Sequence, residues 1–152
     1  MNLISHKTEF IKGEINCPGD KSISQRILII GSFLNCDMQL DGFLNAEDPI
    51  STMEALNEIG ASISISQNQV FLNKRNVPFK NPVNDLNLGN SGTGSRLLLG
   101  FISGLGIRCN LVGDESLSKR PMNRVIEPLK KMGAEIKSND GKLPITTLGS
   151  NI

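Results

Sequence analysis

The stretch PGDKSISQR, residues 18–26, predicts a helix that begins at an anion-binding turn. Pro18 and Gly19 mark a tight turn, and apolar residues at helical spacing follow from Ser22 onward. The first backbone N–H groups of a helix have no partner within the helix, and the aligned peptide dipoles leave partial positive charge there. A phosphate or carboxylate group is therefore favoured at this helix start.

Polar side chains strengthen this predicted site. Lys21 and Arg26 supply full positive charges. Ser22 lies four residues before Arg26, so a hydroxyl and a guanidinium share one face of the helix. A serine-capped surface helix with two solvated cations explains the same residues. Taken alone, the stretch leaves both interpretations open.

The composition is typical of one globular domain that contains a hydrophobic core. The chain has 152 residues, of which 38% are hydrophobic, so we expect a single domain over residues 1–152. Its formal net charge of +1 argues against bulk attraction to nucleic acid or to a membrane. No apolar run is long enough to span a membrane, and the first residues lack the apolar core of a signal peptide.

Cysteine and histidine usage narrows the expected chemistry. The three cysteines form no Cys-x-x-Cys pair, which favours reduced thiols in a cytoplasmic protein. His6 is the only histidine, so neither a histidine metal site nor a Ser/His relay is expected. We therefore predict no metal site.

Apolar periodicity predicts alternating strands and helices in the first half of the chain. In order, these are a strand over residues 9–16, a helix over 22–34, a strand over 38–43, a helix that stops at Gly60, strands over 61–66 and 70–73 around a polar turn at 67–69, and an irregular connector over 75–86. The first helix is expected to face the core with an apolar stripe formed by Ile23, Ile27, Ile30 and Leu34, widened by Ile29 and Phe33.

The same order then repeats with an offset of about 70 residues. Gly89 and Arg96 in GNSGTGSR have the spacing of Gly19 and Arg26, and LNEIGASI from residue 56 matches LKKMGAEI from residue 129. The second unit is expected to hold a helix over 91–103, a strand over 107–112, a helix over 125–132, and strands over 134–137 and 142–147. We therefore predict an α/β fold with an N-terminal strand in residues 1–16, repeat units over 17–74 and 87–149, and helices gathered into a common core.

Two further clusters are rich in groups that bind anions. GNSGTGSR, residues 89–96, offers Asn90 as a cap, three glycines and Arg96, although a glycine-rich packing turn is an equal alternative. SKRPMNR, residues 118–124, carries three cations, which more often form a solvated face. Equivalent helix starts in two repeated units should open onto one side of the domain, so we expect the clusters to converge on anions. Neither the phosphate-loop motif nor the dinucleotide motif is present, so nothing indicates ATP or NAD.

Together, PGDKSISQR, GNSGTGSRLLLG and GDESLSKRPMNRVIEPL resemble three signature segments of the 5-enolpyruvylshikimate-3-phosphate synthase family. The resemblance implies repeated βαβαββ units of the enolpyruvyl transferase type, with helices packed inside and small sheets outside. This chain would hold two of the usual three units of one domain. The implied reaction transfers the enolpyruvyl group of phosphoenolpyruvate to the 5-hydroxyl of shikimate 3-phosphate and releases phosphate, without a cofactor. This transferase reaction belongs to the shikimate pathway of chorismate and aromatic amino acid biosynthesis.

The resemblance also implies roles for particular residues. Shikimate 3-phosphate would be held by Lys21, Ser22 and Arg26, and Lys21 would be the one catalytic residue. Phosphoenolpyruvate would contact a larger set, namely Lys21, Asn90, Gly92, Thr93 and Arg120.

Departures from the family pattern limit what we expect of this chain. Gln25 stands where the family usually has histidine or asparagine, and Gly92 is the position where some glyphosate-insensitive members carry alanine. Family members are much longer, and their catalytic Asp and Lys-Glu groups have no matching position here. Those groups lie in a second domain of the family, which has no match in this chain. The resemblance places the strand at 9–16 in that second domain. We therefore expect a fragment that is inactive alone.

Two other functions remain open. One alternative is an anion-binding module. Another is half of a split enzyme that complements a separately encoded partner. A nucleotide-sugar enolpyruvyl transferase is less favoured, because it would show a Lys-Asn pair in place of Lys21-Ser22.

Overall fold

A computed structural model describes residues 2–66 and 69–149. Its helices are α1 (Lys21–Leu34), α2 (Glu47–Glu58), α3 (Gly92–Gly104), α4 (Glu115–Ser118) and α5 (Asn123–Lys131). Its strands are β1 (Met38–Leu40), β2 (Ile63–Ser66), β3 (Gln69–Leu72), β4 (Leu86–Asn87), β5 (Arg108–Val112), β6 (Ile136–Asn139) and β7 (Lys142–Leu148). The α/β class predicted from the sequence is confirmed.

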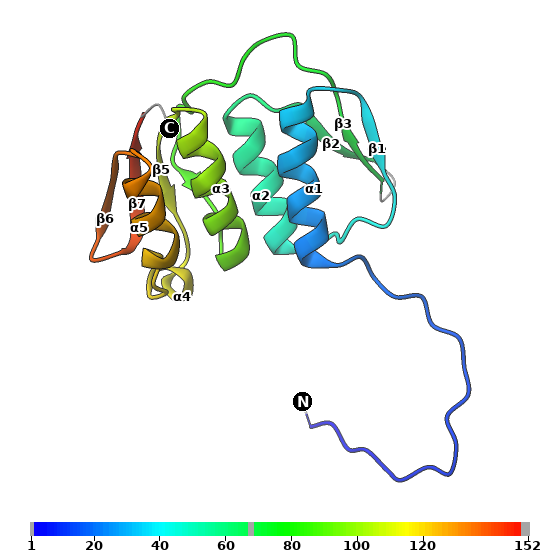
Figure 1. Cartoon of the computed structure of the whole chain (residues 1–152). Coiled ribbons are helices and arrows are strands. Elements are labelled where there is room, and N and C mark those ends of the chain that lie inside the picture. The colour runs from blue at the N-terminus through cyan, green and yellow to red at the C-terminus, as the bar shows by residue number, and fades with distance from the viewer. Residues whose placement is uncertain (1, 67–68, 150–152) are drawn as a thin grey trace.

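The strands form two separate small sheets on opposite sides of a layer of helices (Figure 1). The first sheet is antiparallel with the order β1-β3-β2. The second has the order β4-β5-β7-β6, in which β4 pairs parallel to β5 and the other pairs are antiparallel. Helices α1, α2 and α3 pack against one another between the sheets. This layer places the starts of the three helices at one end of the molecule, the lower end in Figure 1.

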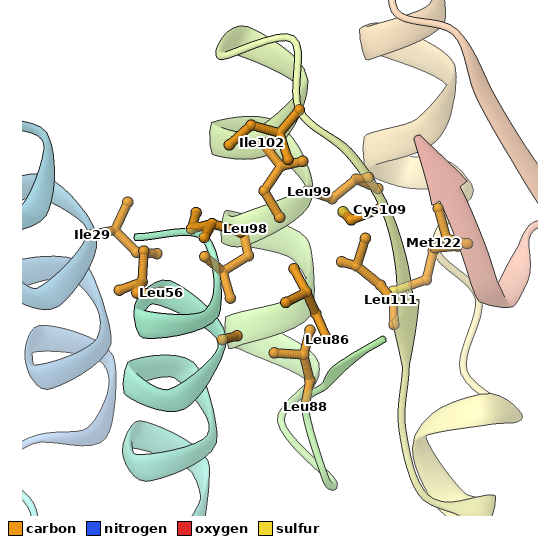
Figure 2. Close-up of a cluster of buried hydrophobic side chains, with 14 of the residues drawn as sticks. Ile29, Leu56, Leu86, Leu88, Leu98, Leu99, Ile102, Cys109, Leu111 and Met122 are labelled. Atoms are coloured by element: carbon orange, nitrogen blue, oxygen red, sulfur yellow. The ribbon is translucent and has the colours of Figure 1, made fainter. Parts of the chain in front are cut away.

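One hydrophobic core joins the helices to both sheets. Leu56 of α2 and Leu98 of α3 are fully buried, and Ile29 of α1 is buried beside them (Figure 2). Leu111 of β5 and Met122 extend the same cluster toward the second sheet. The core therefore holds the helix starts in a fixed arrangement.

Helix α1 forms where the sequence predicts it, but the predicted inward face is wrong. Ile23 is 68% exposed and Ile30 is 54% exposed, whereas Leu28 is completely buried. The buried face also carries small and polar residues, namely Ser24, Gln25, Gly31 and Ser32. These short side chains allow close packing: a Cβ built on Gly31 would lie 2.6 Å from a methyl carbon of Leu72. Of the predicted stripe, Ile29 is buried, whereas Ile23, Ile30, Phe33 and Leu34 face outward.

The predicted strand over residues 9–16 does not form. Residues 2–20 contain no helix or strand, and they extend away from the body of the molecule as an exposed segment (Figure 1). A strand requires a partner for its backbone N–H and C=O groups. None of the described strands pairs with this segment, so its alternating apolar residues stay in solvent.

The remaining predicted elements form with small shifts at their ends. Strand β1 stops at Leu40, before Gly42 adopts a φ of 70°, and α2 stops where Gly60 adopts a φ of 102°. The short elements β4 and α4 were not predicted. Residues 67–68 of the predicted polar turn lie outside the described part of the chain.

Candidate anion-binding site

The start of α1 is capped by a side chain from its own turn. Asp20 is the N-cap, and its carboxylate accepts a hydrogen bond from the Ile23 N–H at 2.8 Å. This carboxylate already occupies part of the backbone site that the sequence predicted for a bound anion. Attraction of a ligand to this helix start therefore depends on the side chains more than on the backbone.

The predicted ligands on α1 point toward solvent. Lys21 is exposed, and its Nζ lies 3.0 Å from Oδ2 of Asp48 in the first turn of α2. Arg26 is exposed and donates from Nη1 to the Ser22 carbonyl at 3.0 Å. Among the described residues Arg26 makes no ion pair, so its charge is open to a ligand.

The start of α3 is a tighter arrangement. Ser91, rather than the expected Asn90, is the N-cap, and its hydroxyl accepts a hydrogen bond from the Gly94 N–H at 3.1 Å. Gly92 is buried under two guanidinium groups. A Cβ added there would lie 2.9 Å from Nη1 of Arg120 and 3.0 Å from Nη1 of Arg96.

Both arginines are held in place by neutral oxygens. Arg120 donates to the side chain of Asn90, to the Asn90 carbonyl at 3.4 Å and to the Ser116 hydroxyl at 3.3 Å. Arg96 donates to the Gly92 carbonyl at 2.8 Å and to the Pro121 carbonyl at 3.0 Å. Neither forms an ion pair with a carboxylate in residues 2–66 or 69–149. Two positive charges thus meet over one glycine without an internal counter-ion, which favours an anion there.

The three cations of the third cluster, residues 118–124, do not all lie at the start of α3. Arg120 reaches α3, as described above. Lys119 instead pairs with Glu115 one turn earlier, at 2.5 Å, and the Lys119 side chain is largely exposed. Arg124 is exposed at the start of α5. Only part of this cationic loop therefore joins the α3 start.

The two helix starts are joined through buried and partly buried groups. Gln25 of α1 donates both to the Asp48 carbonyl and to the Ser91 hydroxyl, so the first turns of α1, α2 and α3 are neighbours. Asn90 and Gly92 both lie against the guanidinium of Arg120. Lys21 is linked to this group indirectly: it pairs with the Asp48 carboxylate, and Gln25 bonds both the Asp48 carbonyl and Ser91. Thr93 is partly exposed in the first turn of α3.

Sequence reasoning missed some residues that build this arrangement. Asp48 was not among the expected residues, and Arg96 was expected in the second anion-binding cluster but not as a ligand of phosphoenolpyruvate. Asp48 gave no signal, because its pairing with Lys21 crosses from one helix to another.

The described ranges lack both a metal-binding cluster and a membrane-spanning helix. No group of three or more His, Cys, Asp or Glu side chains is placed to hold a metal ion there. Nor does that part of the chain contain a helix long and apolar enough to cross a bilayer.

The fold and its cationic helix starts define a class: an α/β protein suited to small anionic ligands. The family model for EPSP synthase (3-phosphoshikimate 1-carboxyvinyltransferase) matches residues 6–152. The chain belongs to this family.

Individual relatives agree with this assignment. The 3-phosphoshikimate 1-carboxyvinyltransferase of Petrotoga mobilis is 47% identical over 147 residues, which cover 94% of this chain and 34% of that protein. The corresponding protein of Ruthia magnifica is 45% identical over 143 residues, covering 93% of this chain and 33% of the relative. An EPSP synthase structure from Acinetobacter baumannii superposes with a TM-score of 0.82 at 37% identity, covering 90% of this chain and 32% of that one. This chain thus spans about a third of the length of the relatives it matches.

Proposed function

We propose that this chain forms one wall of an enolpyruvyl transfer site, which binds shikimate 3-phosphate at the α1 start and phosphoenolpyruvate at the α3 start. Lys21, Ser22 and Arg26 serve the first ligand. Asn90, Gly92, Thr93 and Arg120 serve the second, and Lys21 lies at the boundary as the catalytic residue. Arg96 joins the second group, since its guanidinium lies as close to Gly92 as that of Arg120.

The observation that carries this proposal is the pair of guanidinium groups over Gly92 without a carboxylate partner. Phosphoenolpyruvate has a phosphate and a carboxylate, and both suit the planar donor fork of arginine. Shikimate 3-phosphate is likewise an anion, so the exposed Arg26 and the paired Lys21 fit its phosphate. Family membership supports this pair of ligands over other phosphates.

Turnover requires more than these residues provide. The transfer must add a proton to the enolpyruvyl carbon and remove one from the attacking hydroxyl, with water excluded from the reaction. Lys21 and Arg26 are exposed to solvent, and the Asp48 carboxylate beside Lys21 is engaged in an ion pair. We therefore expect weak binding and no detectable turnover by this chain alone. A remainder that covers the helix starts would supply the second wall.

Binding is tested by titrating the full chain with each substrate and following backbone amides by NMR. Arg120→Gln should weaken phosphoenolpyruvate binding about tenfold, which corresponds to one lost charge-assisted contact. Arg124→Gln is the matched control, because Arg124 is an exposed arginine four residues further along. Equal effects of the two substitutions would refute the site.

Turnover is tested by measuring phosphate release with both substrates. The chain is assayed alone and again after mixing with a separately expressed segment that carries the rest of a relative's sequence. Release only after mixing supports the half-site, whereas robust release by the chain alone contradicts it. Binding without release in either assay favours the alternative of an anion-binding module.

A further inference from the structure

One polar side chain is completely buried where three helices meet. Gln25 has no exposed surface, although its neighbours Lys21 and Arg26 on α1 are exposed. Its Nε2 lies 2.6 Å from the Ser91 hydroxyl, 2.9 Å from the Thr52 hydroxyl and 3.1 Å from the Asp48 carbonyl. These acceptors belong to α2 and to the cap of α3. Burial makes a lost hydrogen bond of this amide nitrogen costly, so its bonds constrain all three helices. The amide oxygen, by contrast, has no hydrogen-bond partner among the described residues.

The orientation of the carboxamide follows from its partners. The Asp48 carbonyl can only accept a hydrogen bond, so the amide nitrogen must face it. Thr52 donates its own proton to the same carbonyl at 3.0 Å, which leaves the Thr52 oxygen free to accept from Gln25. The Ser91 hydroxyl accepts from Gly94 and from Gln25. The two N–H groups of the amide are therefore shared among three acceptors, which tie α1 to α2 and to the cap of α3.

A glycine in the first turn of α3, Gly94, leaves room for the Gln25 side chain. A Cβ built on Gly94 would lie 2.5 Å from Oγ1 of Thr52, 2.6 Å from Oγ of Ser91 and 2.9 Å from Nε2 of Gln25. Only a glycine allows α3 to approach the three polar groups so closely. The polar cluster and the glycine in the first turn of α3 are thus parts of one close helix crossing.

This cluster lies between the two halves of the proposed site. Gln25 directly precedes Arg26, and Ser91 directly precedes Gly92. Asp48 accepts from Gln25 with its carbonyl and holds Lys21 with its carboxylate. We propose that Gln25 is a positioning residue that sets the spacing between the α1 and α3 starts, so that the two anions are held at a fixed separation. This inference rests on the proposed function, because the spacing matters only if both starts bind a ligand.

The test compares Gln25→Met with Leu28→Val in the full chain. Methionine keeps the length of the side chain without its donors, while Thr52 and Ser91 keep their bonds to the Asp48 carbonyl and the Gly94 N–H. Leu28 is fully buried one turn further along α1 and lies outside the polar cluster. Hydrogen exchange of α3 amides reports the position of its first turn, and NMR titrations report the affinity for each substrate.

Gln25→Met should accelerate exchange of the Gly94 and Ser95 amides about tenfold and leave Ile102 in the last turn of α3 unchanged. Phosphoenolpyruvate affinity, measured with shikimate 3-phosphate present, should fall about tenfold, while shikimate 3-phosphate affinity alone changes less than about twofold. Leu28→Val should change neither the exchange of Gly94 and Ser95 relative to Ile102 nor the affinity for phosphoenolpyruvate relative to that for shikimate 3-phosphate. Gln25→His, which returns a ring N–H donor at a similar reach, should restore part of the loss.

Each other result overturns the inference. Unchanged exchange at Gly94 would mean that Gln25 does not hold the α3 start. An even acceleration across all three helices, or equal losses for both substrates, would mean that it serves only as a packing residue. If the unmodified chain binds neither substrate, the proposed function fails, and the exchange pattern alone then decides whether Gln25 positions α3.

Discussion

At the scale of single residues, the most demanding position is Gly92. Its backbone is covered by guanidinium nitrogens of Arg96 and Arg120, and no side chain fits between them without moving one. Both arginines are also tied to main-chain carbonyls. A shift of either group therefore changes the place at which an anion is received.

Replacing Gly92 with alanine should weaken ligand binding without weakening the fold. The new methyl group would press on the ends of two flexible side chains, so the arginines move and phosphoenolpyruvate affinity should fall about tenfold. Stability should stay the same or rise by about 0.5–1 kcal/mol, since alanine favours a helix over glycine. Calorimetric titration and thermal melting measure the two effects.

The control for this substitution is Gly100→Ala on the same helix. A Cβ at Gly100 meets nothing within 4 Å, so it tests helix propensity alone. Equal affinity losses in both variants would contradict the steric explanation.

The three cysteines should react at very different rates. Cys17 and Cys36 are exposed, and Cys109 is buried. Burial raises the pKa of the Cys109 thiol, with a smaller contribution from Asp85, and this outweighs the hydrogen bond to Thr147, which lowers it. Because a raised pKa reduces the thiolate fraction at neutral pH, a disulfide reagent should modify two thiols in the folded chain and the third only after unfolding. Rapid modification of all three would indicate that the second sheet opens readily.

At the scale of elements, α1 is unusual because it is apolar on one exposed face and packed through small residues on another. Leu28 and Ile29 contact the core, while Ile23 and Ile30 face solvent. The periodicity of apolar residues alone therefore pointed to the wrong side of the helix. Gly31 helps to decide the buried side, because its lack of a side chain allows Leu72 of β3 and Met38 of β1 to come close.

Substitutions on the two faces of α1 should differ sharply in their cost. Leu28→Ala should reduce the free energy of unfolding by about 2–5 kcal/mol, as expected for a fully buried leucine. Ile30→Gln should change it by less than about 0.5 kcal/mol, because the side chain is already 54% exposed. Denaturant titrations of the two variants provide the comparison. A large loss for Ile30→Gln would mean that the outward face is covered in solution.

Sequence patterns were reliable where they depend on neighbours along the chain. Gly60 marks the end of α2 through local geometry, and the Gly92 motif marked the second helix start, whereas the cap of the first helix is Asp20 and not the serine considered from the sequence. Sequence patterns were unreliable where the contacts of a residue depend on a partner that is distant in sequence. The Gln25 contact to Ser91 spans 66 positions, and the bond from Arg96 to Pro121 spans 25, so neither has a local signature. The segment at 9–16 has a strand pattern but no pairing edge, and pattern alone does not provide one.

At the scale of the whole molecule, apolar surface is concentrated near α1. Ile29, Ile30, Phe33 and Phe101 line a shallow hollow of about 310 Å³ between α1 and α3. Phe33 is 61% exposed and meets Phe101 edge to face. The extended N-terminal segment adds exposed residues such as Phe10. Exposed apolar side chains that gather in one region often mark a surface that contacts another molecule.

The chain should therefore self-associate as its concentration rises. Sedimentation velocity should show a concentration-dependent increase in mean mass, and the double substitution Ile30→Gln with Phe33→Ser should reduce it. Val83→Ser is the control, because Val83 is 92% exposed but lies away from this hollow. A stable monomer with a sharp, high melting transition would contradict this expectation.

The separation of the two sheets has a consequence for how the chain folds. Strands of the first sheet all come from residues 38–72 and strands of the second from residues 86–148, so neither sheet waits for a strand from the other. Each sheet can therefore close without a chain segment from the other half, which keeps the loops that must be closed shorter than in a sheet built from both halves. The helices must then dock, and that step alone brings residues from both halves together. We expect kinetic experiments to resolve two early, independent sheet-forming events, followed by a slower docking step in which the buried α1 to α3 contacts gain protection from exchange.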